Sequence, residues 1–348
     1  MKRVLREWGF QTDLVDVVNA LYNNTRARVR KGGIITDNFE TTRGVIQGCP
    51  LSPNLFNLYL EKIMTEALGD HEGGVKIGGV SITNLRYADD IVLIAETKEE
   101  LQQLISKTEA QCSRYKLEIN RNKTKVMKIS REPEELDIHL RTGEVEQVDE
   151  FKYLGVYIDR EGRMGRSIRE RIATGMAAFN KMRRLWKNRE ISMALKLRLL
   201  SAIIIPTVIY GSECWNIRKT EESKLLAFEM KCLRRICGVT WEDRISNQEI
   251  RERTGQNVNI MERIRDGQRR WFGHVQRMGG QRWPKTALHG RVDGMRPRGR
   301  PRDSWIKIFK RENEGKSIYE LTRMAMERDQ WMEWRHHMWD PTRNNLNE

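Results

Sequence analysis

Residues 85–94 of the chain read Leu-Arg-Tyr-Ala-Asp-Asp-Ile-Val-Leu-Ile, which places two adjacent carboxylates among apolar and β-branched residues. Such residues favour strands and Asp favours turns, so residues 80–95 are predicted to form a β-hairpin with Asp89 and Asp90 at its turn. Hard divalent cations prefer oxygen ligands. The pattern therefore points to a metal site that handles phosphates, and a merely solvated Asp-Asp turn is the alternative.

A helix is predicted on each side of this hairpin. Upstream, Ser52 offers an N-cap, Pro53 suits the first helical position and Gly69 provides a stop. Downstream, Thr97 and Glu100 have the spacing of a capping box before an amphipathic run. The hairpin is expected to pack on the upstream helix.

The other predicted elements divide the chain into an α+β part and a helical part. Apolar residues recur at helical spacing in the first stretch, where Leu14, Val17, Val18 and Leu21 form one face. Short strands and turns are expected over 29–45, and further strands at 125–129 and 151–158. From 167 to 238 helices alone suffice, with Gly238 as a stop.

Composition narrows the class of partner. The 348 residues carry a formal net charge of +15, which favours a polyanion such as nucleic acid, with a merely basic protein as the alternative. Five cysteines without a Cys-x-x-Cys pair argue against a disulfide scaffold. No apolar run reaches the length of a membrane span and no signal peptide is evident. An intracellular protein, nuclear or cytoplasmic and without a membrane partner, is expected.

Three further blocks accompany the Asp-Asp pair. Residues 44–61 read Gly-Val-Ile-Gln-Gly-Cys-Pro-Leu-Ser-Pro-Asn-Leu-Phe-Asn-Leu-Tyr-Leu-Glu, residues 117–125 contain Leu-Glu-Ile-Asn and Lys-Thr-Lys, and residues 151–156 read Phe-Lys-Tyr-Leu-Gly-Val. In this order and spacing the blocks resemble the later motifs of the reverse transcriptase palm. The resemblance is closest to non-LTR retrotransposons of the endonuclease–reverse transcriptase type, and it covers residues 1 to 160.

The resemblance implies an RNA-directed DNA polymerase that uses an RNA template, a DNA primer or target, dNTPs and two Mg²⁺ (or Mn²⁺) ions. For every assigned residue except Asp89 a purely structural role is the alternative; Gly48, for example, would simply turn the chain. The implied site residues are Asp89 and Asp90 for metal binding and catalysis, Gln47, Gly48, Tyr87 and Lys123 for nucleotide and template binding, and Tyr153, Leu154 and Gly155 for the primer grip.

The same resemblance implies that one metal ligand is missing. In the family, the first metal-binding aspartate lies on a strand just before the helix that begins near Val4 here, and the sequence starts inside that helix. A two-metal site that lacks a carboxylate should bind metal poorly. The chain is therefore expected to be catalytically incomplete, and a non-catalytic nucleic-acid-binding remnant of a retroelement is the alternative. An RNA-dependent RNA polymerase would share the adjacent aspartates but not the block at 47–53.

By the same resemblance, the expected domains are a partial fingers and palm region at 1–160, a helical thumb-like region at 161–240 and a basic nucleic-acid-binding region at 241–348. Residues 261–310 contain fourteen Lys or Arg against four Asp or Glu. Residues 297–301, Pro-Arg-Gly-Arg-Pro, resemble the core of an AT-hook, although a basic linker is the alternative. The residues predicted to bind nucleic acid are Arg269, Arg270, Arg296, Arg298, Arg300 and Arg302.

Two other residue types in this region were considered as ligand contacts. Six tryptophans lie beyond residue 270 and could stack on bases, but the i,i+3 pair of Trp331 and Trp334 is predicted to be core. Cys232, Cys237 and His274 match no compact zinc pattern, so no zinc is predicted and both cysteines are expected in the core.

Overall fold

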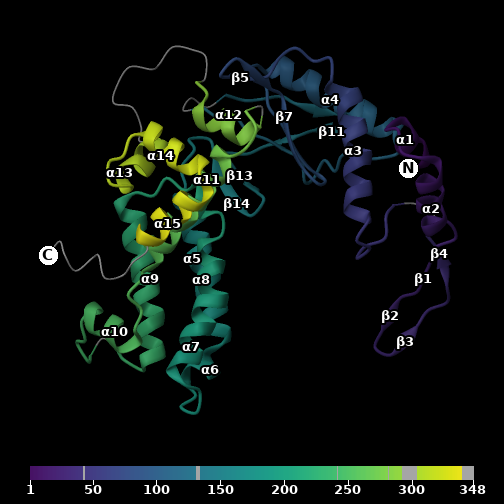
Figure 1. Cartoon of the computed structure of the whole chain (residues 1–348). Helices are drawn as coiled ribbons and strands as arrows, with labels where there is room; N and C mark the ends of the chain where they lie inside the picture. The colour runs from purple at the N-terminus through teal and green to yellow at the C-terminus, as the bar shows by residue number, and fades with distance from the viewer. Residues whose placement is uncertain (42–43, 131–133, 241, 281, 292–303, 339–348) are drawn as a thin grey trace. The chain divides into compact units, whose positions relative to one another are not determined.

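The computed structural model describes residues 1–41, 44–130, 134–240, 242–280, 282–291 and 304–338 (Figure 1). They form two compact units. The first consists of residues 1–126 and 135–147, and the second of residues 127–134 and 148–348. Each unit mixes helices with short two-stranded sheets, and each is described by itself.

The first unit joins four helices to a series of hairpins. Its strands pair antiparallel as β1–β4, β2–β3, β5–β6, β7–β8 and β10–β11, whereas β9 pairs parallel with β12. The helices are α1 (Lys2–Glu7), α2 (Thr12–Tyr22), α3 (Ser52–Leu68) and α4 (Lys98–Arg114). The strands are β1 (Arg26–Ala27), β2 (Arg30–Lys31), β3 (Ile34–Ile35), β4 (Phe39–Glu40), β5 (Val75–Ile77), β6 (Val80–Ile82), β7 (Asn84–Tyr87), β8 (Asp90–Leu93), β9 (Lys125–Val126), β10 (His139–Leu140), β11 (Gly143–Glu144) and β12 (Glu146–Gln147).

The packing of α3 on α4 supports the β7–β8 hairpin. Met64 and Leu104 are fully buried where the two helices meet, and Ile91 and Leu93 of β8 pack against the same cluster. The alternation of β8 therefore directs its apolar side chains onto the helices. This confirms the predicted hairpin and its packing on the helix that begins at Ser52, although the hairpin starts at Asn84 because residues 80–82 pair with β5.

Three local predictions for the first unit need correction. Ser52 is the first residue of α3 rather than its N-cap, because its hydroxyl is used elsewhere. Thr97 does cap α4, but Glu100 accepts from the backbone amide of Glu96 instead of that of Thr97. The inward face of α2 is formed by Val15 and Val18, so three residues of its predicted face are exposed: Leu14, Val17 and Leu21.

The second unit begins with a hairpin and is otherwise helical. The hairpin replaces the single strand predicted at 151–158, and the helical prediction for 167–238 with its stop at Gly238 (φ 71°) is confirmed. Its elements are β13 (Glu150–Tyr153), β14 (Val156–Asp159), α5 (Gly165–Lys181), α6 (Arg183–Lys187), α7 (Met193–Leu199), a π-helical turn (Leu200–Ile204), α8 (Ile205–Ile209), a 3-10 turn (Ser212–Cys214), α9 (Lys219–Cys237), α10 (Asn247–Thr254), α11 (Ile260–Gln276), α12 (Trp283–His289), α13 (Trp305–Glu312), α14 (Ile318–Met326) and α15 (Arg328–Met338).

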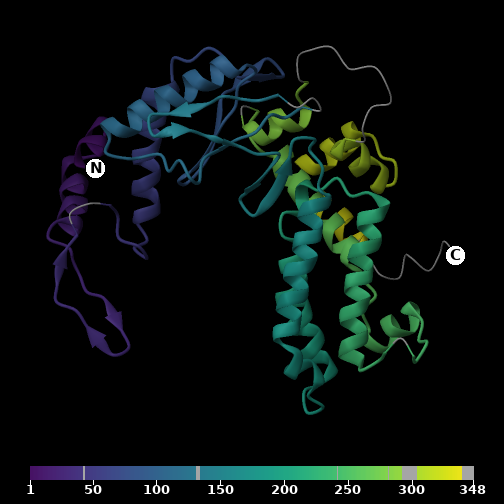
Figure 2. The ribbon, with the colours of Figure 1, turned by 180° about the vertical axis from the view of Figure 1, so that it is seen from behind.

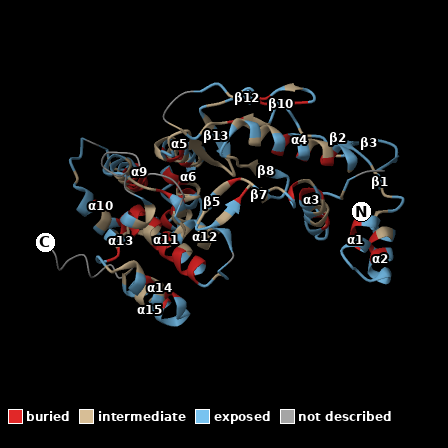
Figure 3. Ribbon diagram, turned by 90° about the horizontal axis from the view of Figure 1, so that it is seen from above, coloured by how far each residue is buried: buried red, intermediate tan, exposed pale blue. Residues whose placement is uncertain are grey.

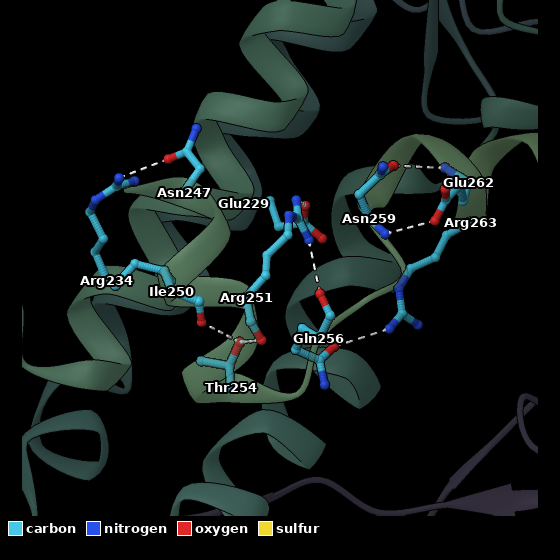
Figure 4. A network of polar contacts seen from close by, with 10 residues as sticks. All are labelled: Glu229, Arg234, Asn247, Ile250, Arg251, Thr254, Gln256, Asn259, Glu262 and Arg263. Atoms are coloured by element: carbon cyan, nitrogen blue, oxygen red, sulfur yellow. Dashed lines mark hydrogen bonds and ion pairs between the residues drawn. The ribbon is translucent and has the colours of Figure 1, made fainter. Parts of the chain in front are cut away.

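Helices α5, α8 and α9 enclose the larger core of this unit. A Cβ at Gly175 of α5 would lie 2.2 Å from Cγ2 of Val208 and 3.4 Å from Phe228, so the helices approach closely only because this residue is glycine. Helix α10 joins this core through polar contacts. Arg251 donates to the buried carboxylate of Glu229 at 2.7 Å, and Arg234 donates to Asn247 at 2.7 Å (Figure 4).

Helix α11 is the centre of a second core in this unit. Most of its residues are buried, and helices α12 to α15 follow it in the chain (Figure 3). Trp331 is 1% exposed and its indole donates to the backbone oxygen of Arg269 at 3.1 Å. Phe272 and Phe309 stack on each other beside it. Trp331 is therefore a core residue, as predicted, and the partly buried Trp334 packs against it.

No helix in the described ranges combines the length and apolarity that a membrane crossing requires.

Two glycines of α11 give a matched test of this packing. A Cβ at Gly273 would lie 2.3 Å from the indole nitrogen of Trp331, whereas a Cβ at Gly267 would meet nothing within 4 Å. We expect Gly273→Ala to lower the free energy of unfolding by about 1–3 kcal/mol through overpacking. Gly267→Ala should raise it by up to about 1 kcal/mol through helix propensity. Urea unfolding of both variants measures the difference, and equal effects would refute the described packing of Trp331.

Candidate functional site

The tip of the β7–β8 hairpin presents the two carboxylates. Tyr87 pairs with Asp90 across the strands, so Ala88 and Asp89 form a two-residue turn. Ala88 has a φ of 52°, a conformation that is uncommon for a residue other than glycine. Local backbone strain of this kind costs of order 1–3 kcal/mol and often accompanies functional turns. The hairpin thus holds Asp89 at its tip at a conformational cost.

Both carboxylates are exposed at the end of the hairpin. Within the described part of the chain, neither Asp89 nor Asp90 has an ion pair or a side-chain hydrogen bond. The nearest cation in the sequence, Arg86, is instead held by Glu61 at 2.6 Å and by Asn84 at 2.7 Å. Tyr87 at the end of β7 is 64% exposed. The oxygens at this tip are consequently available to an external cation.

The carboxylates suit a hard cation in kind but not in number. Carboxylate oxygen is the usual protein ligand for Mg²⁺. However, no group of three or more His, Cys, Asp or Glu residues among those the structure describes is arranged to hold a metal ion. The tip therefore supplies two carboxylates, and the described ranges add no third His, Cys, Asp or Glu side chain to them.

Side chains of α2 and α3 hold the turn at Gln47 and Gly48 in place. The amide of Cys49 donates to the carbonyl of Ile46 at 3.2 Å, and Gly48 lies between them with a φ of 88°. The Ser52 hydroxyl donates to the same carbonyl at 2.6 Å and contacts the Tyr22 hydroxyl at 2.8 Å. A Cβ at Gly48 would meet nothing within 4 Å. Hydrogen bonds to the Ile46 carbonyl thus hold the backbone of this turn. The side of Gly48 on which a Cβ would project is open.

Lys123 lies at the end of a tight turn that precedes β9. Its amide donates to the carbonyl of Asn120 at 3.1 Å, and its side chain is exposed. The following lysine in the block, Lys125, is instead paired with Glu146. Of the two lysines, Lys123 is the one whose ammonium group is free to meet a ligand.

The predicted primer grip forms the β13–β14 hairpin of the second unit. Leu154 (φ 46°) and Gly155 (φ 79°) are its two turn residues, as a type I′ turn requires. The Tyr210 hydroxyl donates to the Leu154 carbonyl at 3.2 Å, and Arg171 donates to the Gly155 carbonyl at 2.6 Å. The guanidinium of Arg171 also lies 4.2 Å from the centre of the Tyr210 ring. Tyr153, the last residue of β13, is partly buried.

The sequence did not single out Arg171 or Tyr210, because their role depends on the folding of α5 and α8 against the hairpin. A further link comes from Ser167, whose hydroxyl accepts from the Tyr157 amide at 2.7 Å and donates to its carbonyl at 3.0 Å. Side chains of the helical region therefore fix both the turn and one strand of this hairpin.

The basic region corrects part of the predicted nucleic-acid contacts. Arg269 is 5% exposed and donates to Asn313 at 2.7 Å, because α11 is buried on the side that carries it. It is not available to a phosphate. Arg270 is exposed and pairs with Asp266 at 3.1 Å. The remaining predicted contacts lie outside the described residues, as does the AT-hook-like segment at 297–301: Arg296, Arg298, Arg300 and Arg302.

The cysteines considered for a metal site behave as core residues. Cys232 is fully buried, and burial raises the pKa of its thiol to about 12. Burial also raises the pKa of Cys237. Cys232 therefore lies in the core as predicted, whereas Cys237 is partly buried and packs against it.

Comparison with known proteins relates the first part of the chain to a protein family. Residues 3–158 match the model described as "Reverse transcriptase (RNA-dependent DNA polymerase)". The chain is 32% identical over 170 residues to the Retrovirus-related Pol polyprotein from the type-2 retrotransposable element R2DM of Drosophila melanogaster, an alignment that covers 46% of this chain and 16% of that protein. It is 30% identical over 169 residues to the corresponding polyprotein from the type-1 retrotransposable element R2 of Nasonia vitripennis, covering 45% and 16%.

A shorter relative matches over more of the chain. A putative uncharacterized transposon-derived protein of Caenorhabditis elegans is 28% identical over 278 residues, which is 74% of this chain and 96% of that protein. The chain thus spans nearly all of this relative but only about one sixth of the R2 polyproteins. The chain therefore carries a reverse transcriptase domain over residues 3–158, and this domain is homologous to the reverse transcriptases of non-LTR retrotransposons.

Proposed function

We propose that Asp89, with Asp90 beside it, is the metal-binding element for RNA-directed DNA synthesis from a DNA primer, an RNA template and dNTPs. The observation that carries this proposal is the pair of exposed, unpaired carboxylates at a strained hairpin turn within the reverse transcriptase domain. Bound Mg²⁺ ions would activate the attacking hydroxyl and stabilise the leaving oxygen of a nucleotidyl transfer.

The other predicted site residues would position the substrates. Gly48 leaves the outer side of its turn open, so a base pair could approach the backbone there, with Gln47 beside it. The free ammonium group of Lys123 would offset negative charge on the triphosphate. The rigid Leu154–Gly155 turn would hold the primer end. Tyr87 would contact the nucleotide or template next to Asp89.

The small number of carboxylates at the hairpin tip supports a limit on the catalytic activity of this chain by itself. The described residues provide two carboxylates at the tip and no third His, Cys, Asp or Glu side chain placed to join them. We therefore propose that this chain alone binds nucleic acid but does not assemble a complete two-metal site. This is the non-catalytic alternative, and it applies to residues 1–348 as tested by themselves.

A primer-extension assay tests this limit. Purified chain with a primed RNA template, dNTPs and Mg²⁺ should give no extension above that of Asp89→Ala, because removing one ligand from an incomplete site changes nothing. Both proteins should bind the primer–template equally in the same buffer. Synthesis that depends on Asp89 would show that the site is complete, and would contradict the proposed limit while supporting the role of Asp89 itself.

Two glycines test the role of the β13–β14 turn. Gly155 and Gly162 both have positive φ, but only at Gly155 would a Cβ clash with a side chain, at 2.8 Å from Nη2 of Arg171. Gly155→Ala should destabilise the turn by about 1–3 kcal/mol and weaken binding of a duplex with a recessed primer end. Gly162→Ala carries the backbone strain alone and should bind normally. Anisotropy titrations compare the two, and equal affinities would argue against a primer grip here.

A further inference from the structure

Residues 181–189, Lys-Met-Arg-Arg-Leu-Trp-Lys-Asn-Arg, contain five basic residues and no acidic one. This stretch covers the end of α5, all of α6 and the residues after it. All five basic side chains are exposed, and within the described ranges none has an ion pair or a side-chain hydrogen bond. We call Lys181, Arg183, Arg184, Lys187 and Arg189 the α6 basic cluster.

The cluster is carried by a rigid element. Trp186, in the middle of α6, is buried and stacks on Phe179 of α5 with ring centres 4.7 Å apart. Its indole nitrogen donates to the Phe179 carbonyl at 2.7 Å. Met182 and Leu185 also pack against the core. The backbone under the basic residues is therefore ordered before any ligand arrives, which lowers the entropic cost of binding.

Several other cations of this unit are paired or hydrogen-bonded within the fold, in contrast to the five of the cluster. Arg251 pairs with Glu229 and Arg234 is held by Asn247 (Figure 4). Arg335 pairs with Asp266 at 2.9 Å. Glu190 directly follows the cluster but forms no ion pair with it in the described part. Five like charges thus lie close together without a compensating acidic partner among the residues that the structure describes.

Helix stabilisation does not account for the arrangement. Lys181 and Lys187 end their helices, where a cation interacts favourably with the helix dipole. Arg183, in contrast, is the first residue of α6, where a cation is disfavoured. Crowded like charges also repel one another. An external anion with several negative groups would relieve both costs.

We propose that the α6 basic cluster binds the phosphate backbone of a nucleic-acid duplex. Arg and Lys recognise phosphates without reading sequence, and a ladder of phosphates matches several cations displayed together. The choice of nucleic acid over other polyanions rests on the reverse transcriptase family of residues 3–158 and not on the proposed metal role of Asp89.

This contact lies apart from the proposed primer grip. The β13–β14 hairpin packs at the start of α5 through Ser167 and Arg171, whereas the cluster begins at the last residue of α5. The ribbon shows the hairpin and α6 at opposite ends of α5 (Figures 1 and 2). At about 1.5 Å per residue, a 17-residue helix separates its two ends by about 25 Å. The two contacts would therefore meet different parts of one duplex.

A charge-matched pair of variants of the full chain tests the proposal. The cluster variant combines Arg183→Gln, Arg184→Gln, Lys187→Gln and Arg189→Gln. The control variant changes four exposed basic residues of the first unit to Gln, so both lose the same charge: Arg6, Lys76, Lys107 and Lys116. Fluorescence anisotropy with an RNA–DNA duplex at several salt concentrations measures affinity, and circular dichroism and melting verify the folds.

The cluster variant should bind the duplex at least about tenfold more weakly near 0.1 M salt. Its plot of log affinity against log salt should flatten by roughly two to three, since each lost phosphate contact removes about 0.9 from the slope. The control variant should stay within twofold of the unmodified chain.

Equal losses in the two variants would overturn the proposal, because net charge alone would then explain binding. A cluster variant that keeps its duplex affinity but loses binding to phosphatidylserine vesicles would also overturn it, in favour of a lipid surface. The assay requires neither metal nor Asp89, so its failure is distinguishable from failure of the proposed catalytic role.

Discussion

The close approach of α5 to α8 and α9 is the contact on which most of the second unit depends. It is possible because Gly175 leaves room for Val208 and Phe228, and it fixes α5 along its whole length. The first turns of α5 bind the β13–β14 hairpin, and its end supports α6 through Phe179 and Trp186. The packing of α5 around Gly175 thus supports two features. One is the predicted primer-grip turn at the start of α5, and the other is the basic cluster at its end.

Two hairpin turns with strained or left-handed residues occupy the predicted site positions. The turn that carries Asp89 has Ala88 at positive φ, and the predicted primer-grip turn has Leu154 and Gly155 there. The first packs on α3 and α4 through its own apolar strand, while polar bonds from Arg171 hold the second. In the first turn the carboxylate of Asp89 is left exposed, whereas in the second the carbonyls of Leu154 and Gly155 are used to hold the turn in place.

The sequence was most informative where local pattern and packing agree. The stretch rich in β-branched residues and interrupted at Asp89 and Asp90 predicted the hairpin. Pro53 and Gly69 predicted the start and the end of α3. Phe151 to Ile158 also looked like one strand, although Gly155 is a residue that a type I′ turn favours. Such a turn divides the segment because Leu154, a residue with no preference for it, adopts positive φ between the paired strands.

Features that depend on distant packing could not be predicted in this way. The hydroxyl of Ser52 donates to the Ile46 carbonyl and contacts the Tyr22 hydroxyl instead of capping α3. Both partners are brought to Ser52 by the tertiary fold. Arg269 belongs to the most basic region by charge count, yet tertiary packing of α11 turns it inward. The charge count that drew attention to residues 261–310 did not distinguish the denser cluster at 181–189. That cluster stands out by its exposure and by the absence of ion pairs within the described ranges.

We infer that α5, the β13–β14 hairpin and α6 unfold as one cooperative body that does not include the Asp89 hairpin. Amide hydrogen exchange in the unmodified chain and in Val208→Ala tests it most directly, because this substitution loosens the α5–α8 contact far from both ends of α5. Residues 150–159 and 183–187 should lose protection together with α5, while residues 84–93 keep theirs. The opposite result, in which residues 84–93 lose protection and residues 150–159 keep theirs, would contradict this inference.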